Sequence, residues 1–429
     1  MFFRRHQQRV LVIGLDGVPH SLLLEFCQQG IMPRTARFLS QGHLYSMRAS
    51  LPEISAVSWT DFMTGTNSAT HGIFGFTDFK PFSYDLRFPN FNDVRVPVIW
   101  EKLSQQGKKC IVINQPSTYP ARPLKGILIS GFVAIDLARA VYPPQEIERL
   151  KKINYQIDVD TAAARAHRDT LWSELKRTLE SRWEAIKLYW SENWDYFELV
   201  ITGTDRLHHY FMKAARSGDH PAHQNFLNYY RAVDELIGYL LESFTSQKGD
   251  PASVFILSDH GFCELKKEVY LNCWLQEQGL LRFRHEDPQS LADLDDSTVA
   301  FALDPGRIYL HLQGKFPHGK IAQEERDRWL EEIKRALLEL TYDGQRVIQK
   351  VYRSEEIYSG PLISSGPDLV ALPYPGFDLK GSIKKKELFL DSDLEGMHTQ
   401  HDAFFWTTAE VPENLKIADC YKIIMERLA

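Results

Sequence analysis

The stretch Val10–Leu15, VLVIGL, ends at Asp16 and indicates the fold most clearly. A short apolar run that ends at a carboxylate is typical of a buried strand in a parallel α/β sheet. Two more runs lead to an aspartate in a similar way, namely Phe197–Ile201 before Asp205 and Val254–Leu257 before Asp259. Because open parallel sheets bind ligands at the carboxyl ends of their strands, we expect the three aspartates to lie together at one edge of a sheet.

Strand-like and helix-like patterns alternate through most of the chain. Further strands are predicted at residues 108–114, 126–130, 366–371 and 403–407, and the third of these is expected to return to the main sheet. This alternation predicts an α/β fold with one large, mostly parallel central sheet flanked by helices. We expect residues 1–429 to form a single domain with two insertions, a helical one at about 135–190 and a mixed α/β cap at about 280–355.

The helical insertion carries a stripe of large apolar residues at spacings of three and four. Its members are Trp172, Leu175, Leu179, Trp183, Ile186 and Trp190. Such a stripe could form an apolar wall for a substrate, but the helical period favours ordinary packing onto the sheet.

Composition and charge narrow the functional classes. The formal net charge is −6 and there is no long basic run, which argues against a non-specific nucleic-acid surface. No segment has the length of a membrane span, and the apolar run after the N-terminal arginines is too short for a secretory signal. Five cysteines without CxxC spacing favour a reducing compartment. We expect a cytoplasmic protein with no membrane partner and no nucleic-acid partner; the oligomeric state stays open.

Two of the three aspartates are followed by a histidine at a spacing that suits metal binding. His209 comes four residues after Asp205, so both would share one face of a helix. His260 follows Asp259 directly, and both could reach one ion only at a turn, which Gly261 permits. Each pair alone could be a helix cap or a strand-ending turn. Carboxylate and imidazole together, however, are ligands that zinc and manganese prefer, so the set predicts a metal centre.

A serine and two later histidines complete the candidate residues. Ser55 stands before a helix-like run, where a serine can cap the helix and face its positive end. Its hydroxyl becomes a nucleophile only if a cation or a base activates it. His398 and His401 lie three residues apart ahead of the last strand, and chemistry alone leaves the choice of ligand between them open.

Together these motifs resemble the type I phosphodiesterase/nucleotide pyrophosphatase family of the alkaline phosphatase superfamily. The resemblance rests on VIGLDG at 12–17, LPEISAVSWTDFMTGTNSATHGIFGF at 51–76, TDRLHHYF at 204–211 and LSDHGF at 257–262. It implies an alkaline-phosphatase-like fold, a small phosphate ester as substrate and two divalent ions, zinc or alternatively manganese. The implied ligands of the first ion are Asp16, Ser55, Asp259 and His260, and those of the second are Asp205, His209 and His398.

The resemblance also implies a reaction. Ser55 would attack phosphorus in line and form a covalent intermediate, which water would then hydrolyse between two cations about 4 Å apart. His398 is favoured over His401 as the ligand of the second ion. The predicted activity is therefore cleavage of a phosphodiester or pyrophosphate bond.

Three positions depart from the family pattern. Ser55 replaces the threonine of many relatives. The pair His401-Asp402 departs from the sequence that relatives more often have after the last ligand histidine. The run His71-Gly72-Ile73 is followed by Phe74, Gly75 and Phe76. None of these three can make the side-chain contact to phosphate that an asparagine after this run makes in nucleotide pyrophosphatases, so a preference for nucleotides does not follow. The sulfatase signature is missing around Ser55. A phosphomonoesterase, a phosphonate hydrolase and a non-catalytic metal-binding scaffold remain as alternatives.

Overall fold

The centre of the molecule is an eight-stranded sheet. The structure, a computed structural model, describes residues 8–428. The strand order is β2-β21-β9-β1-β8-β5-β6-β7, and the five strands from β9 to β6 run parallel. Their bounds are β1 Val10–Leu15, β5 Cys110–Gln115, β6 Gly126–Ser130, β8 Tyr196–Ile201 and β9 Val254–Leu257. The other three strands form only antiparallel pairs, and they are β2 His43–Met47, β7 Val141–Tyr142 and β21 Ala403–Thr407. The prediction of a large, mostly parallel central sheet is confirmed.

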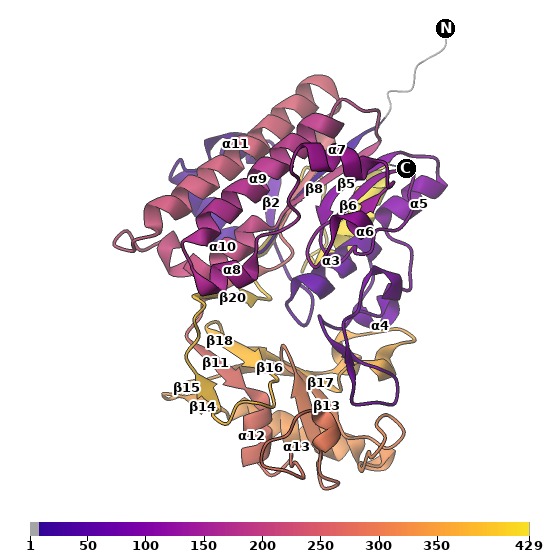
Figure 1. The fold of residues 1–429 in the computed structure, drawn as a ribbon, viewed down its shortest axis with the longest axis vertical. Helices are drawn as coiled ribbons and strands as arrows, with labels where there is room; N and C mark the ends of the chain where they lie inside the picture. Colours follow the sequence, from indigo (N-terminus) through magenta and orange to yellow (C-terminus); the bar gives the residue numbers. More distant parts are fainter. Residues whose placement is uncertain (1–7, 429) are drawn as a thin grey trace.

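Helices cover both faces of this sheet, because alternate residues of each buried strand face opposite sides. Leu11 and Ile13 of β1 belong to the hydrophobic cluster on one face, while Val10 and Val12 belong to that on the other. The first face packs against α1 His20–Gln28, α2 Pro33–Leu39, α9 Thr170–Tyr189, α10 Gly203–Phe211 and α11 His223–Gln247. The second packs against α3 Ser55–Thr64, α5 Ile99–Gln105 and α15 Ile417–Leu428. The long helices α9 and α11 lie side by side in Figure 1.

The helical segment before β8 packs onto the sheet. It consists of α6 Leu137–Ala140, α7 Glu146–Lys152, α8 Thr161–Ala166 and α9. Trp190 packs against Phe197 of β8 with ring centroids 5.2 Å apart, and Trp172 stacks on Phe211 at 4.6 Å. The apolar stripe of α9 therefore forms core and not a substrate wall.

Smaller sheets form a second layer below the central sheet in Figure 1. Four antiparallel strands follow the order β12 Ala300–Leu303, β13 Arg307–Leu310, β17 Leu369–Pro373 and β16 Ile348–Arg353. Three others follow the order β18 Phe377–Lys380, β11 Lys267–Tyr270 and β19 Phe389–Leu390. Helices α12 Leu271–Glu277 and α13 Arg326–Leu338 pack on these sheets in a separate hydrophobic cluster.

One strand prediction is wrong. The segment 366–371 was expected to return to the main sheet, but the strand there, Leu369–Pro373, pairs with β13 and β16 in the second layer. Its five residues are all buried, as they would be in either sheet. Burial on both faces predicts a strand but does not identify its partners.

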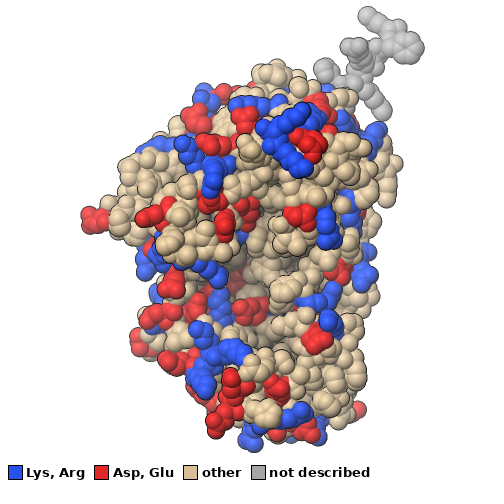
Figure 2. Space-filling model, viewed as in Figure 1, with Lys and Arg blue, Asp and Glu red and all other residues tan. Residues whose placement is uncertain are grey.

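A two-stranded ribbon lies where the two layers meet. It pairs β10 Gly261–Glu264, directly after β9 and its aspartate, with β20 Gly396–Thr399. In this register Phe262 lies opposite His398, so a residue near the end of the chain is held next to the edge of the central sheet. Figure 2 shows a hollow between the two layers, with acidic and basic side chains along it. Among the described residues, no helix is long and apolar enough to cross a membrane.

Candidate metal centre

The three aspartates lie at the carboxyl ends of three neighbouring strands. Asp16 follows β1, Asp259 follows β9, and Asp205 lies in the first turn of α10, which follows β8. The parallel register aligns these strand ends, since Leu15 pairs with Ile201 and Gly14 with Leu257. All three carboxylates are buried. The expectation from the strand pattern therefore matches the observed geometry.

The first ligand group consists of Asp16, Asp259 and His260. One ligand atom of each lies within 4.8 Å of the others. The Oγ of Ser55, the first residue of α3, is 3.3 Å from Asp16 Oδ1 and 3.1 Å from His260 Nε2. Ser55 thus turns its hydroxyl into this group instead of capping its helix.

The second ligand group consists of Asp205, His260 and His398, again with ligand atoms within 4.8 Å of one another. His398 Nε2 lies 3.2 Å from Asp205 Oδ1 and 3.0 Å from His209 Nε2. His209 Nε2 is in turn 3.5 Å from Asp205 Oδ1. The structure therefore brings all the sequence-predicted ligands into one place.

Backbone carbonyls orient three of the imidazoles. The Nδ1 of His398 is 3.0 Å from Glu53 O, that of His209 is 3.2 Å from Gly396 O, and that of His260 is 3.1 Å from Gly261 O. An Nδ1–H that donates to a carbonyl leaves Nε2 as the free acceptor, which is how metal-binding histidines are usually held. Each of these three Nε2 atoms faces the carboxylates.

The donor set fits divalent cations. Asp259 Oδ1 accepts a hydrogen bond from the Gly17 N–H at 3.0 Å. Asp259 Oδ2 is buried and accepts no hydrogen bond from any described residue, although His260 Nε2 lies 3.3 Å away. A buried carboxylate oxygen without a partner is costly unless a cation or a donor reaches it. The carboxylate oxygens and imidazole nitrogens that gather here are typical zinc or manganese ligands.

The electrostatics of the site also favour bound cations. Burial, followed by the charges of Asp259 and Asp205, raises the pKa of Asp16 well above its usual value. Burial and the Asp205 charge raise the pKa of Asp259 to about 7, against the lowering effect of the Gly17 N–H. Burial lowers the pKa values of His209 and His260 to about 3, so both imidazoles are neutral near pH 7. Positive charge placed among these groups would relieve the repulsion between the carboxylates.

His401, the alternative candidate, and His208, the neighbour of His209, do not belong to the ligand groups. His401 is exposed and lines a separate surface hollow with Tyr45 and Arg48, away from the ligand groups. His208, which precedes His209 on α10, is fully buried: Nδ1 is 2.9 Å from Gly17 O and Nε2 is 2.7 Å from the Tyr230 hydroxyl. It therefore connects the turn after Asp16 to helix α11.

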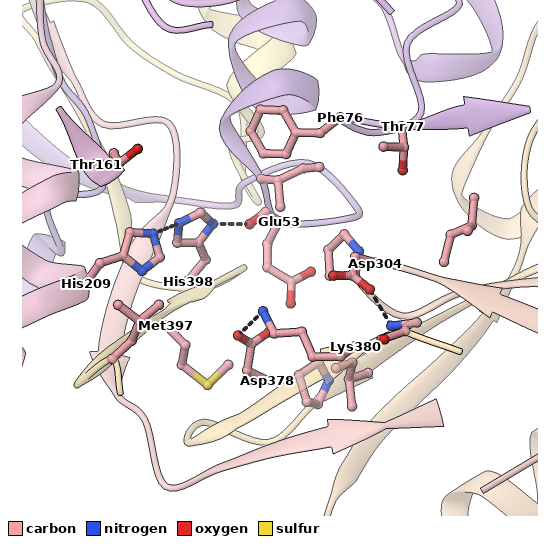
Figure 3. Close-up of a pocket in the computed structure, with 18 of the residues that line it drawn as sticks. Glu53, Phe76, Thr77, Thr161, His209, Asp304, Asp378, Lys380, Met397 and His398 are labelled. Atoms are coloured by element: carbon pink, nitrogen blue, oxygen red, sulfur yellow. Dashed lines mark hydrogen bonds and ion pairs between the residues drawn. The ribbon is translucent and has the colours of Figure 1, made fainter. Parts of the chain in front are cut away.

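The cavity beside the metal centre contains residues that sequence reasoning missed. It measures about 610 Å³ and extends from His209 and His398 to strand β18. Phe76 and Phe132 form an apolar wall, with ring centroids 5.5 Å apart. Figure 3 shows Glu53 and Lys380 pointing into the cavity. No local motif distinguishes these side chains, because they come together only in the folded chain.

Comparisons with known proteins identify the family. The family model for type I phosphodiesterase / nucleotide pyrophosphatase matches residues 10–403, so the chain belongs to this family of hydrolases. Phosphonoacetate hydrolase from Sinorhizobium meliloti 1021, in complex with phosphonoformate, has a similar structure, with a TM-score of 0.65 and 16% identity over 99% of this chain and 96% of that chain.

Murine ectonucleotide pyrophosphatase / phosphodiesterase 5 is similar at a TM-score of 0.55 and 14% identity, over 98% of this chain and 95% of that one. At these identities the similarities show a shared fold. No curated protein matches the chain. The resemblance found in the motifs is confirmed, and so is the alkaline-phosphatase-like fold.

Proposed function

We propose that this protein is a two-metal hydrolase that cleaves phosphodiester or pyrophosphate bonds with Ser55 as nucleophile. The observation that carries the proposal is the position of Ser55 Oγ, 3.3 Å from Asp16 Oδ1 and 3.1 Å from His260 Nε2 at the start of α3. A serine hydroxyl at the first residue of a helix can contact both a bound cation and the free N–H groups of the helix.

The first ion would be held by Asp16, Ser55, Asp259 and His260, and the second by Asp205, His209 and His398. Imidazole and carboxylate ligands favour zinc, with manganese as the alternative. When bound, the two cations would stabilise the negative charge that develops on the phosphoryl group and lower the pKa of the Ser55 hydroxyl.

The side chains of the chain itself set the geometry of the reaction. Ser55 Oγ would attack phosphorus and the ester oxygen would depart from the opposite side, so that the new O–P bond forms as the old one breaks. His398 and His209, held by Glu53 O and Gly396 O, would face the departing oxygen. Water would then attack the phosphoserine, restore the Ser55 hydroxyl and release phosphate or a phosphate monoester.

A phosphonate hydrolase is the second candidate, and the residues that follow the His-Gly-Ile run favour it. None of Phe74, Gly75 and Phe76 can supply the contact that an asparagine after the His-Gly-Ile run makes to phosphate in nucleotide pyrophosphatases, and the Phe74 ring is buried against Tyr358 with centroids 5.4 Å apart. The phosphonoacetate hydrolase with the similar fold was solved with phosphonoformate and with phosphonoacetate. A substrate panel at matched metal loading, with bis-p-nitrophenyl phosphate, p-nitrophenyl phosphate and phosphonoacetate, separates diesterase, monoesterase and phosphonate hydrolase.

The test of the proposal combines metal analysis with turnover. We expect the wild-type protein to hydrolyse bis-p-nitrophenyl phosphate, and Ser55→Ala to lose roughly a thousandfold or more in kcat, as expected when a nucleophile is removed. Ser173→Ala, an exposed serine on α9, is the matched control and should keep full activity. Full turnover by Ser55→Ala would remove the nucleophile. A metal-loaded protein that is inert towards the whole panel would favour the non-catalytic scaffold.

A further inference from the structure

The wall of the cavity that faces the metal centre carries charged groups that the reaction does not use. These are Glu53, Asp304, Asp378 and Lys380, and Figure 3 shows all four pointing into the same space. Glu53 comes from the loop before α3, while the other three come from the second layer. The cavity is therefore lined by metal ligands on one side and by a second set of charges on the other.

Glu53 is the most informative member of this wall. The residue is only 6% exposed, and its backbone carbonyl is already used by His398. Its carboxylate points into the cavity, and the only hydrogen-bond donor on it is its own backbone N–H. No other described residue pairs with it. A carboxylate buried in this way is costly unless a ligand supplies a donor or a positive charge.

The basic side chains around the cavity do not fill that role. Lys380 is paired with Asp378 at 2.5 Å. Arg206 donates to Asp158 and Asp205, at 2.7 Å and 3.0 Å. Arg165 lines the cavity but is exposed, so water screens its charge.

The carboxylates of this wall can also accept further hydrogen bonds. Asp304 Oδ1 accepts the Gly381 N–H, and the described residues form no ion pair with Asp304. The wall thus carries three carboxylates against one lysine. This balance favours a positively charged, donor-rich ligand group and disfavours a second anion.

We propose that the cavity binds a phosphodiester in which one alcohol carries a protonated amine, and that Glu53 is its main partner, with Asp304 and Asp378 nearby. This inference rests on the proposed function, since the phosphate of the same molecule would lie at the metal centre. The ammonium group offers three N–H donors to the carboxylates. A substrate with a carboxylate in place of the amine would be repelled.

Three p-nitrophenyl phosphodiesters test the proposal, with 2-aminoethyl, ethyl or 2-carboxyethyl as the second ester group. We expect kcat/KM to be about tenfold higher for the aminoethyl ester than for the ethyl ester, as for one charge-assisted hydrogen bond, and lowest for the carboxyethyl ester. Glu53→Gln should bring the aminoethyl-to-ethyl ratio close to one. Glu148→Gln, the same change at an exposed position on α7, should leave the ratio unchanged.

The outcomes separate this inference from the proposed function. Hydrolysis of all three esters at equal kcat/KM, or an aminoethyl preference that survives in Glu53→Gln, would overturn the inference and leave the proposed function intact. If no ester is hydrolysed, the proposed function fails, and a binding measurement then tests the inference. Calorimetry on Ser55→Ala should then show tighter binding of 2-aminoethyl methyl phosphate than of ethyl methyl phosphate, and a second change, Glu53→Gln, should abolish the difference. Equal affinities would overturn the inference.

Discussion

His260 occupies a central position among the candidate ligands. Its Nε2 is 3.6 Å from Asp16 Oδ1 and 3.9 Å from Asp205 Oδ1, so it lies between the two ligand groups. The rings of His209, His260 and His398 all contact Phe262, with centroids 4.8 to 5.8 Å apart. Phe262 belongs to the LSDHGF motif, yet only the fold reveals that it packs among three imidazoles. We infer that it restricts their orientation.

The choice between His398 and His401 leads to a first prediction. We expect His398→Ala to lower the bound metal by about one ion per chain and to reduce diesterase activity strongly, because the second ligand group loses an imidazole. His401→Ala should change neither, since that side chain is exposed and outside the ligand groups. Metal analysis by mass spectrometry and steady-state kinetics provide the measurements. Loss of metal in His401→Ala alone would reverse the assignment.

Gly17 supports a second prediction. Its φ is +65°, and a Cβ there would lie 3.1 Å from His260 Cε1 and 3.0 Å from Phe262 Cδ2. We expect Gly17→Ala to displace His260 and to lower kcat at least tenfold, in addition to about 1 kcal/mol of backbone strain. Gly30→Ala is the matched control: its φ is +71° and no atom lies within 4 Å of the added Cβ. Equal kcat losses in both variants would show that strain alone explains the effect.

Individual site residues were predictable where a possible ligand side chain directly follows a strand in the sequence. Asp16, Asp259 and His260 follow apolar runs, and parallel strands bring their ends together. Glu53 and His208 were not identified as functional, because what they contact depends on residues far away in the chain. Glu53 faces strand β18, and His208 reaches Gly17 and Tyr230.

At the scale of elements, β8 contains a buried acid that leads to a third prediction. Glu198 is fully buried and accepts a hydrogen bond from the Tyr196 hydroxyl, while its Oε1 has no partner among the described residues. Burial raises the pKa of Glu198 to about 8, although the Tyr196 hydrogen bond lowers it. The folded protein therefore retains a proton that the unfolded chain loses above about pH 4.5.

The sign of the effect follows from proton linkage. Between pH 4.5 and about 8 the folded state binds more protons at Glu198, so rising pH lowers stability. Relative to wild type, we expect Glu198→Gln to gain stability over this range, on the order of 4 kcal/mol. Urea unfolding at pH 5, 6.5 and 8 measures the difference in unfolding free energy between Glu198→Gln and wild type. A difference that stays constant with pH would contradict the prediction.

The elements of the central sheet were more predictable than those of the second layer. Buried parallel strands appear as continuous apolar runs, so β1, β5, β6, β8 and β9 were recognised from sequence. The ribbon of β10 and β20 was not predicted, since its strands are only four residues long and 132 positions separate Glu264 from Gly396. The strand at 369–373 was placed in the wrong sheet for another reason, since its five buried residues suit either sheet.

At the scale of the whole molecule, the expectation of one domain with insertions remains a proposal. The second layer has its own hydrophobic cluster, but Asp78 pairs with Arg307 at 3.1 Å and the Tyr358 hydroxyl donates to Leu51 O, so contacts cross between the layers. As a fourth prediction, we expect a single calorimetric transition for the metal-loaded protein, with equal calorimetric and van't Hoff enthalpies. Two separate transitions would indicate that the layers are independent domains.

Metal removal gives a fifth prediction, because the ligand groups are built from segments that are far apart in the chain. A ligand present at 100 times its Kd adds about 2.7 kcal/mol to folding stability. We therefore expect a chelator to lower the Tm and added zinc to restore it. Asp259→Asn should lose most of this shift, whereas Asp287→Asn, an exposed control in the second layer, should keep it. An unchanged Tm with the chelator would argue against structural coupling of the metal.

The position of β21 has a consequence for synthesis on the ribosome. This strand inserts between β2 and β9, and β20, which carries His398, immediately precedes it along the chain. The central sheet therefore keeps a vacant slot, and the second ligand group lacks His398, until residues 396–407 have been translated. We therefore expect nascent chains and fragments that end before residue 396 to be inert towards phosphate esters and to expose the unpaired edge of β9.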